Sequence, residues 1–206
     1  PVRHVFMTAD REKSRAELGF DQSDFVLLAF GGSQGAGRVN KAMTGIIEAF
    51  NGLKGFRICL ATGSYYYDAI KEELKEKGIQ VADNVDIMEY IHDMAKYLSA
   101  ADLVISRSGA LSVAEVTVCG VPAVFIPSPL VTGNHQYFNA KAVADKGGAL
   151  IIEEKDLNND ELIGEILKLK NDPATLKQMA EKSYSCAPLD ATGIICDSIM
   201  EAIGQK

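Results

Sequence analysis

Six short apolar runs recur along this chain, and each is followed by a stretch in which apolar residues repeat with helical spacing. The apolar runs cover residues 25–30, 56–61, 85–88, 103–105, 123–126 and 149–152. The predicted helices cover residues 39–50, 65–77, 94–101, 111–119, 136–146 and, with breaks near Pro173 and Pro188, the chain from Asn159 onward. Continuous apolar strands that alternate with helices are typical of a parallel sheet covered on both faces. The pattern therefore predicts an α/β fold with a Rossmann-like sheet, whose ligands bind beyond the carboxyl ends of the strands.

The length and charge of the chain narrow the kinds of protein it can be. Its 206 residues suffice for one ordinary domain, and no linker divides residues 1–206. The formal net charge is −7 and long basic stretches are missing, which argues against bulk nucleic-acid binding. No apolar run is long enough to span a bilayer, and the start shows no signal-peptide pattern. Because the first residue is Pro1 and not methionine, we expect a piece of a longer protein.

The spacing of cysteine and histidine argues against a metal site. The four cysteines contain no CxxC pair, and they are Cys59, Cys119, Cys186 and Cys196. The three histidines lack the spacing of metal ligands, and they are His4, His92 and His135. We therefore expect four reduced, mostly buried thiols, with no disulfide framework and no metal ion.

The segment 106–115 follows an apolar run and reads as a strand end, a turn at Gly109 and the start of a helix. Helix N-termini carry unpaired N–H groups and a partial positive charge, which suit phosphate groups. Glu115 stands five residues after Ala110, about 7.5 Å along a helix axis, and its side chain leans back toward the turn. An ionised carboxylate can accept both protons of a cis-diol. The segment thus favours a nucleotide site, with phosphate at the turn and ribose at Glu115. A capping box formed by Ser112 and Glu115 is the structural alternative, and the spacing alone does not separate the two.

A second glycine-rich turn, 31–35 with the sequence GGSQG, stands between an apolar run and a predicted helix. Its glycines permit a tight turn and a close approach of backbone to ligand, and Ser33 could donate a hydrogen bond to a phosphate oxygen. The alternative is a plain turn with Ser33 as a helix cap. The turn matches neither the GxGxxG nor the P-loop pattern, and no acidic residue follows the run 56–61 to bind an NAD ribose. A dinucleotide oxidoreductase is therefore disfavoured.

A polar cluster marks another predicted helix start, at 134–139. His135 and Asn139 are four residues apart and share a helix face, and amide side chains suit sugar hydroxyl groups. Helix capping by Asn134, with the other side chains in solvent, is the alternative. The aromatic run 65–67 is expected to pack or to form a subunit surface and not to stack on a base.

These motifs, in this order, resemble the MurG-type enzymes of glycosyltransferase family 28. The resemblance rests on 31–36 with Asn40, on 101–115, on 135–139 and on the opening residues 1–3, which are similar to an interdomain segment of that family. It covers most of the chain. It implies the C-terminal half of a two-domain GT-B fold, a single domain that binds a UDP-sugar donor, with the N-terminal acceptor domain outside this chain.

The resemblance also implies how the donor would be held. Ser33 and the helix start at Gly109 and Ala110 would hold the diphosphate, with Gln34 and Leu111 beside them. The remaining contacts would come from three places. Glu115 would bind the ribose diol, the backbone of Ile91 would read the uracil edge, and Arg3 would approach the nucleotide from the hinge. The hydroxyl groups of the donor sugar would be contacted by His135, Gln136 and Asn139.

The implied reaction is inverting transfer of N-acetylglucosamine from UDP-N-acetylglucosamine to a lipid-linked muramoyl-pentapeptide, the step from lipid I to lipid II in peptidoglycan synthesis. Helix N-termini would stabilise the leaving UDP without a metal or a cofactor, and the catalytic base would lie in the missing domain. That domain would bind the undecaprenyl-linked acceptor at the cytoplasmic face of the bacterial inner membrane, where the protein would be peripheral. The isolated chain would bind the donor and transfer little or nothing. Two alternatives are a free-standing UDP-sugar-binding subunit with a separate membrane partner, and a related transferase that makes another glycolipid.

Overall fold

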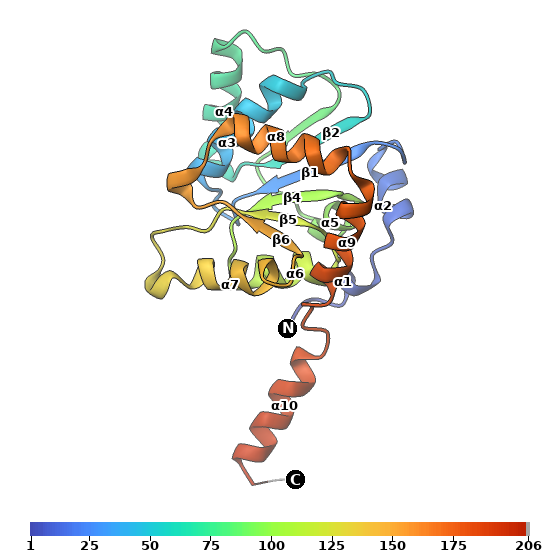
Figure 1. The fold of residues 1–206 in the computed structure, drawn as a ribbon, viewed down its shortest axis with the longest axis vertical. Helices are drawn as coiled ribbons and strands as arrows, with labels where there is room; N and C mark the ends of the chain where they lie inside the picture. The colour runs from blue at the N-terminus through green and yellow to red at the C-terminus, as the bar shows by residue number, and fades with distance from the viewer. Residues whose placement is uncertain (205–206) are drawn as a thin grey trace.

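A six-stranded parallel sheet forms the centre of the protein, and the computed structural model describes residues 1–204 of it (Figure 1). The strand order is β3-β2-β1-β4-β5-β6, which reverses direction between β1 and β4. The strands are β1 (Phe25–Phe30), β2 (Phe56–Ala61), β3 (Val85–Met88), β4 (Leu103–Ser106), β5 (Ala123–Phe125) and β6 (Ala149–Ile151). This is the Rossmann order, in which ligands bind at the reversal point. The predicted fold class is confirmed.

Helices cover both faces of the sheet, as predicted. One face carries α3 (Gly37–Phe50), α4 (Ser64–Glu76) and α8 (Asn159–Lys170). The other carries α1 (Val5–Thr8), α2 (Arg11–Leu18), α5 (Met94–Ala100), α6 (Ala110–Val118) and α7 (His135–Ala144). Two short 3₁₀ turns precede α7 and α8, and they are Thr132–Asn134 and Glu154–Asp156. The helix α9 (Pro173–Tyr184) packs against both α6 and α8.

The central strands are apolar throughout because both of their faces are buried. In β1, Phe25, Leu27 and Ala29 pack into one core, while the alternate residues Val26 and Leu28 pack into the other. Leu27 and Leu28 are fully buried. A strand between two helical layers has no solvent-facing side, so its sequence does not alternate between apolar and polar residues.

The structure differs from the sequence prediction mainly at the ends of elements and at the N-terminus. The helix predicted from residue 39 begins at Gly37, and the one predicted from 136 begins at His135. Pro173 does break the last helical region, because it is the first residue of α9 and Asp172 caps that helix. The helices α1 and α2 were not predicted, since they are short and bury few side chains.

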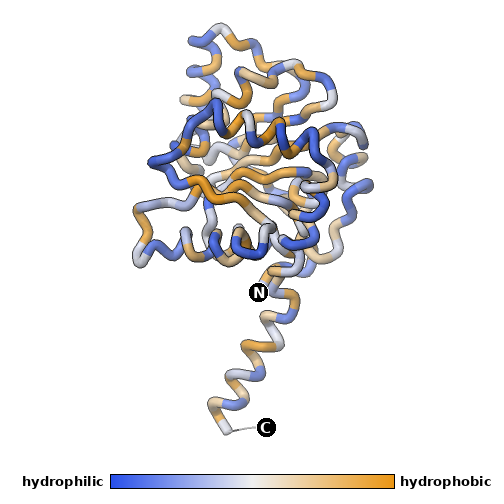
Figure 2. The backbone as a smooth tube through the Cα atoms, in the orientation of Figure 1, coloured by the Kyte–Doolittle hydropathy of each residue, from blue (hydrophilic) through white to orange (hydrophobic). Residues whose placement is uncertain are grey.

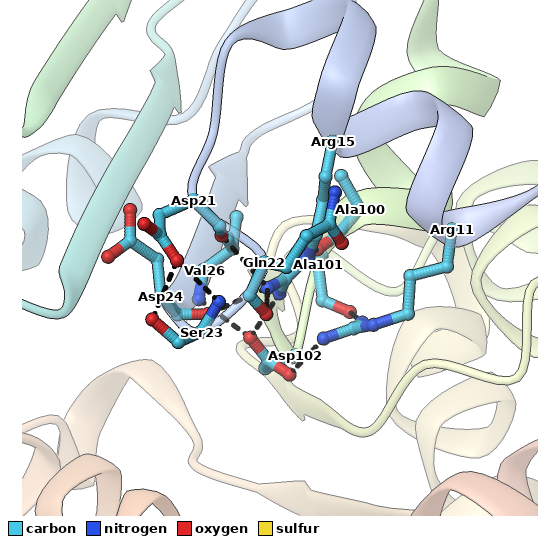
Figure 3. A network of polar contacts seen from close by, with 10 residues as sticks. All are labelled: Arg11, Arg15, Asp21, Gln22, Ser23, Asp24, Val26, Ala100, Ala101 and Asp102. Atoms are coloured by element: carbon cyan, nitrogen blue, oxygen red, sulfur yellow. Dashed lines mark hydrogen bonds and ion pairs between the residues drawn. The ribbon is translucent and has the colours of Figure 1, made fainter.

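A buried arginine joins α2 to the amino ends of β1 and β4 (Figure 3). The side chain of Arg15 is 1% exposed, and its guanidinium donates 2.7 Å to the carboxylate of Asp102. It also donates to four backbone carbonyls, those of Asp21, Gln22, Asp24 and Ala100. The other donors to Asp102 are the N–H group of Val26, at 2.7 Å, and the guanidinium of Arg11. Buried charges persist only where such partners satisfy them.

The last helix, α10 (Ala191–Ala202), extends away from the rest of the fold (Figure 1). None of its side chains is buried, and Figure 2 shows apolar residues along its length. Ile194, Ile199 and Met200 are among its exposed apolar side chains. No helix among residues 1–204 has the length and apolar character needed to cross a membrane.

The cysteine prediction is correct in part. All four cysteines are free thiols. Cys59 is buried, Cys119 and Cys186 are partly buried, and Cys196 is exposed on α10, so the expectation that most are buried is wrong. Cys59 lies on a central strand, where burial raises the pKa of its thiol. Cys196 is exposed because α10, which has no buried residue, extends away from the rest of the fold.

Candidate functional site

A cavity of about 420 Å³ lies beyond the carboxyl ends of β1, β2 and β3, next to the start of α6. It is located where the strand order reverses, which is the position the fold favours for a ligand. Five of the residues predicted to bind a ligand line it together: Arg3, Ser33, Ile91, Leu111 and Glu115. The sequence analysis did not single out Phe30, Ala61 or Glu89, which also line it. Their place at or just after a strand end is the signal that could have found them.

The glycine turn forms one wall of this cavity. Gly31 is tightly packed, because a Cβ atom on it would lie 2.3 Å from the backbone nitrogen of Ala36. Gly32 has a φ of +89°, and a Cβ atom there would meet nothing within 4 Å, so its side of the turn is open. The helix α3 begins at Gly37 with Ala36 at its N-cap and no side-chain cap. The interpretation of Ser33 as a helix cap is therefore wrong, and its hydroxyl makes no hydrogen bond within residues 1–204.

The N-terminus of α6 forms a second wall. The helix begins at Ala110, Gly109 is its N-cap, and no side chain caps it. The first N–H group that bonds inside the helix is that of Val113, which donates 3.0 Å to the carbonyl of Gly109. The preceding N–H groups at Ala110 and Leu111 are left for an external acceptor, as at any helix start. The structure thus has an uncapped helix N-terminus at the position where the sequence predicts a phosphate site.

Glu115 lies within α6 and is half-buried in the cavity wall. Burial raises the pKa of its carboxyl, and the nearby charge of Arg3 opposes that rise. The capping box predicted as the structural alternative does not form, since α6 has no side-chain cap hydrogen bond. The carboxylate is therefore not engaged at the helix start. Arg3 lines the same cavity, with its guanidinium 5.0 Å from the centre of the Phe6 ring.

The segment after β3 forms the third wall, with Tyr90, Ile91 and His92. Ile91 lines the cavity, although the residue as a whole is only 2% exposed and belongs to the buried core. Across the described chain, neither its N–H nor its C=O group has a hydrogen-bonding partner. A buried residue with both backbone groups unpaired is uncommon, because such groups are costly without a partner.

The remaining predicted residues lie outside the lining of this cavity. Gln136 accepts a 2.9 Å hydrogen bond from the N–H of Ser128, and Asn139 donates 3.1 Å to the carbonyl of Ser108. His135 is exposed, and its Nδ1 atom lies 3.0 Å from the carbonyl oxygen of Thr132. These polar groups join the start of α7 to the loops after β4 and β5.

Two further residues named from the sequence, Asn134 and Gln34, also lie outside the lining of the cavity. Asn134 is the N-cap residue of α7, as predicted, but it has a φ of +52° and its side chain makes no cap hydrogen bond. The backbone of Gln34 packs against Gly63, where a Cβ atom would lie 2.4 Å from its carbonyl carbon.

The other groups named from the sequence are scattered. In the tyrosine run, Tyr65 is exposed, while Tyr66 packs against the core beside α3, in agreement with the prediction of packing. Within the part of the chain that the structure describes, no group of three or more His, Cys, Asp or Glu side chains is placed to hold a metal ion.

Comparison with protein families gives a match over most of the domain. The model of the glycosyltransferase family 28 C-terminal domain matches residues 26–191. The chain belongs to glycosyltransferase family 28. The matched residues include β2 to β6, all of β1 except Phe25, and the three walls of the cavity, whereas Arg3 lies outside the match. The resemblance stated from the sequence is thereby confirmed.

Known family 28 proteins are similar along the whole chain. A UDP-N-acetylglucosamine–N-acetylmuramyl-(pentapeptide) pyrophosphoryl-undecaprenol N-acetylglucosamine transferase of Desulforudis audaxviator is 39% identical over 100% of this chain and 56% of its own length. A second transferase with this name, from Bacillus thuringiensis, is 43% identical over 87% of this chain and 48% of its own length. The crystal structure of Acinetobacter baumannii MurG matches with a TM-score of 0.77 and 30% identity over 96% of this chain and 55% of that one. The family 28 chain described here thus spans about half the length of these relatives.

Proposed function

We propose that residues 1–206 form the donor-binding domain of an enzyme that transfers N-acetylglucosamine from UDP-N-acetylglucosamine to a lipid-linked muramoyl-pentapeptide. The observation that carries this proposal is the convergence of three unengaged groups on one cavity. They are the carboxylate of Glu115, the hydroxyl of Ser33 and the backbone of Ile91. The names of the family 28 relatives supply the donor and the acceptor.

Each part of a UDP molecule has a matching wall. The paired donor and acceptor of the Ile91 backbone suit the edge of uracil, which offers a carbonyl oxygen next to an N–H group. The carboxylate of Glu115 can accept both hydroxyl protons of the ribose. The diphosphate would lie between Ser33 and the start of α6, where N–H groups and the helix dipole favour negative charge. The donor sugar would then extend toward α7, where we place its contacts with His135, Gln136 and Asn139.

The chemistry requires stabilisation of the UDP that leaves as the acceptor hydroxyl attacks. Helix N-termini aimed at the diphosphate provide such stabilisation without a metal ion. The second carboxylate that lines the cavity, Glu89, directly precedes the segment to which we assign the uracil and not the sugar, so we assign the base and the undecaprenyl-linked acceptor to a further domain. We place the complete protein at the cytoplasmic face of the bacterial inner membrane, as a peripheral enzyme.

Calorimetric titration of this chain with UDP-N-acetylglucosamine, UDP-glucose and NAD tests the proposal. We expect binding of UDP-N-acetylglucosamine in preference to UDP-glucose, and no binding of NAD, because the acidic residue that an NAD ribose requires is missing after β2. Preferential binding of NAD, or the same affinity for all three ligands, would contradict the proposal.

Replacing Ser33 with alanine is expected to weaken UDP binding about ten-fold, because a hydroxyl that donates to a charged phosphate is lost. The affinity for uridine, which has no phosphate, should stay unchanged. Titration calorimetry with the two ligands measures both values. An equal loss of affinity for uridine would show that Ser33 acts through the fold and not through the diphosphate.

Acid should weaken donor binding through Glu115. The pKa of its carboxyl is raised by burial in the free protein, while the ribose diol binds the ionised form. The affinity for UDP-N-acetylglucosamine should therefore fall as the pH is lowered from neutral toward the raised pKa of Glu115, and binding in that range should release protons. Calorimetry in buffers of different ionisation enthalpy measures both effects. The Glu115→Gln variant has no carboxyl at this position to titrate. Its affinity for UDP-N-acetylglucosamine should be lower than that of the unmodified chain and should not change over this pH range. A pH profile as steep as that of the unmodified chain would rule out Glu115 as the group responsible.

A further inference from the structure

Behind the cavity, a buried contact between the turns after β1 and β2 connects two of its walls. These walls are the glycine turn and the segment after β3. A Cβ atom on Gly35 would lie 1.9 Å from the carbonyl oxygen of Thr62, and one on Gly63 would lie 2.4 Å from the carbonyl carbon of Gln34. The glycine turn after β1 and the turn after β2 therefore touch backbone to backbone. Neither glycine can accept a side chain while that contact persists.

Hydrogen bonds hold this contact in place from both sides. On one side, the amide of Asn40 in α3 donates 2.9 Å to the carbonyl of Thr62. On the other, the N–H groups of Thr62 and Gly63 donate 2.9 Å to the carbonyls of Met88 and Glu89, at the end of β3. The hydroxyl of Thr62 lies 3.2 Å from the same Met88 carbonyl and 3.0 Å from the carbonyl of Gly63. The contact thus runs from the glycine turn to the segment that contains Ile91.

Burying the Asn40 side chain costs folding free energy, which indicates that its hydrogen bond to Thr62 has a role in holding the contact. It is 1% exposed, and its Oδ1 atom is buried without a hydrogen-bonding partner among the described residues. An unpaired buried acceptor destabilises a fold, whereas an apolar side chain would avoid that cost. What the amide contributes is its donation to Thr62, which fixes the second turn against the first.

We infer that Thr62 is a positioning residue that sets the spacing between the diphosphate wall at Ser33 and the uracil wall at Ile91. It is fully buried and does not line the cavity, so it acts through its neighbours. This inference rests on the proposed UDP site. A ligand that contacts both the Ser33 wall and the Ile91 wall, such as UDP, should therefore depend on Thr62. A ligand that contacts only one of these two walls, such as uridine, should not. A ligand that contacts both walls binds more tightly when their spacing is preorganised, because ordering two mobile walls on binding costs part of the binding free energy.

The Thr62→Val variant tests this inference, because valine keeps the shape of the side chain and removes the hydroxyl. We expect UDP affinity to fall about two- to ten-fold, as for the loss of one hydrogen bond, while uridine affinity changes little. Thr62→Ser keeps the hydroxyl and should restore UDP affinity. Thr44→Val is the matched control: Thr44 is equally buried, its hydroxyl donates 2.8 Å to the Lys41 carbonyl in α3, and it lies outside the cavity lining. It should leave both affinities unchanged.

A second pair of variants perturbs the contact directly. Gly63 and Gly78 have φ values of +78° and +70°, so alanine strains both backbones similarly, but only at Gly63 would its Cβ atom meet another turn. Gly63→Ala should lower UDP affinity more than uridine affinity, whereas Gly78→Ala should affect neither. Thermal unfolding of each variant confirms that it is folded at the temperature of titration.

The outcomes separate this inference from the proposed function. If the unmodified chain binds neither UDP nor uridine, both are contradicted. If it binds both, and Thr62→Val and Gly63→Ala either leave UDP affinity unchanged or weaken UDP and uridine by the same factor, the positioning role is wrong and the proposed donor site stands.

Discussion

Replacing Arg15 with alanine is expected to lower the free energy of unfolding by about 3–5 kcal/mol, the range for breaking a buried ion pair on one side. The guanidinium is 1% exposed and pairs with Asp102. Its removal leaves that carboxylate short of a partner and three of the four backbone carbonyls without a donor, since the Asp21 carbonyl still accepts from the N–H group of Asp24. Each unpaired buried group adds to the cost. Urea unfolding followed by circular dichroism measures the change.

Two variants serve as controls for this result. Lys13→Ala removes a charge from the same helix, but Lys13 is exposed and its ion pair with Glu17, at 3.9 Å, is a surface pair, so the change should be below about 1 kcal/mol. Arg15→Lys keeps the charge and loses the planar fork of donors, so it should recover only part of the stability. Full stability in Arg15→Ala would show that the network contributes nothing to folding.

Replacing Glu115 with alanine is expected to weaken UDP binding about ten- to a hundred-fold, because hydrogen bonds from the ribose hydroxyls to a charged acceptor are lost. The fold should be affected little, since α6 has no capping box for the substitution to remove. Calorimetric titration measures affinity, and thermal unfolding measures stability on the same sample.

Deoxy-UDP provides the matched control for Glu115. It lacks one of the two hydroxyl groups, so the unmodified chain should bind it more weakly than UDP, and Glu115→Ala should lose the ability to distinguish the two ligands. If the variant still prefers UDP by the same factor, the carboxylate does not contact the diol. If stability falls and UDP affinity is unchanged, its role is structural.

The sheet could be predicted from the sequence because burial on both faces leaves a strong signal. The six apolar runs match β1 to β6 within one residue at each end. The helix ends were less accurate, because a helix start is decided by backbone hydrogen bonds that several adjacent residues can provide. The sequence has little apolar periodicity over α1 and α2, since Phe6 and Arg15 are buried among mostly exposed neighbours. Arg15 is buried because it is paired with Asp102, and a search for apolar residues does not detect a buried arginine.

The candidate site could be predicted only in part. Strand ends bring Ser33, Ile91 and Glu115 to one cavity, as the order of the motifs suggested. Whether Glu115 was a helix cap could not be decided from spacing, because a capping box and a free carboxylate share one pattern. The hydrogen bonds of Gln136 and Asn139 to loops after other strands depend on tertiary structure, and no local pattern encodes them. The contact of Gly35 with Thr62 is equally long-range.

The Arg15 network lies at the amino ends of β1 and β4, whereas the cavity lies at the opposite, carboxyl edge of the same sheet. The loops after β1, β3 and β4 can therefore be redesigned without altering the charged groups that anchor α2. Ligand preference at the proposed donor site is accordingly open to engineering by loop exchange. An altered nucleotide or sugar specificity can be selected there while the anchor at the far edge preserves a common scaffold.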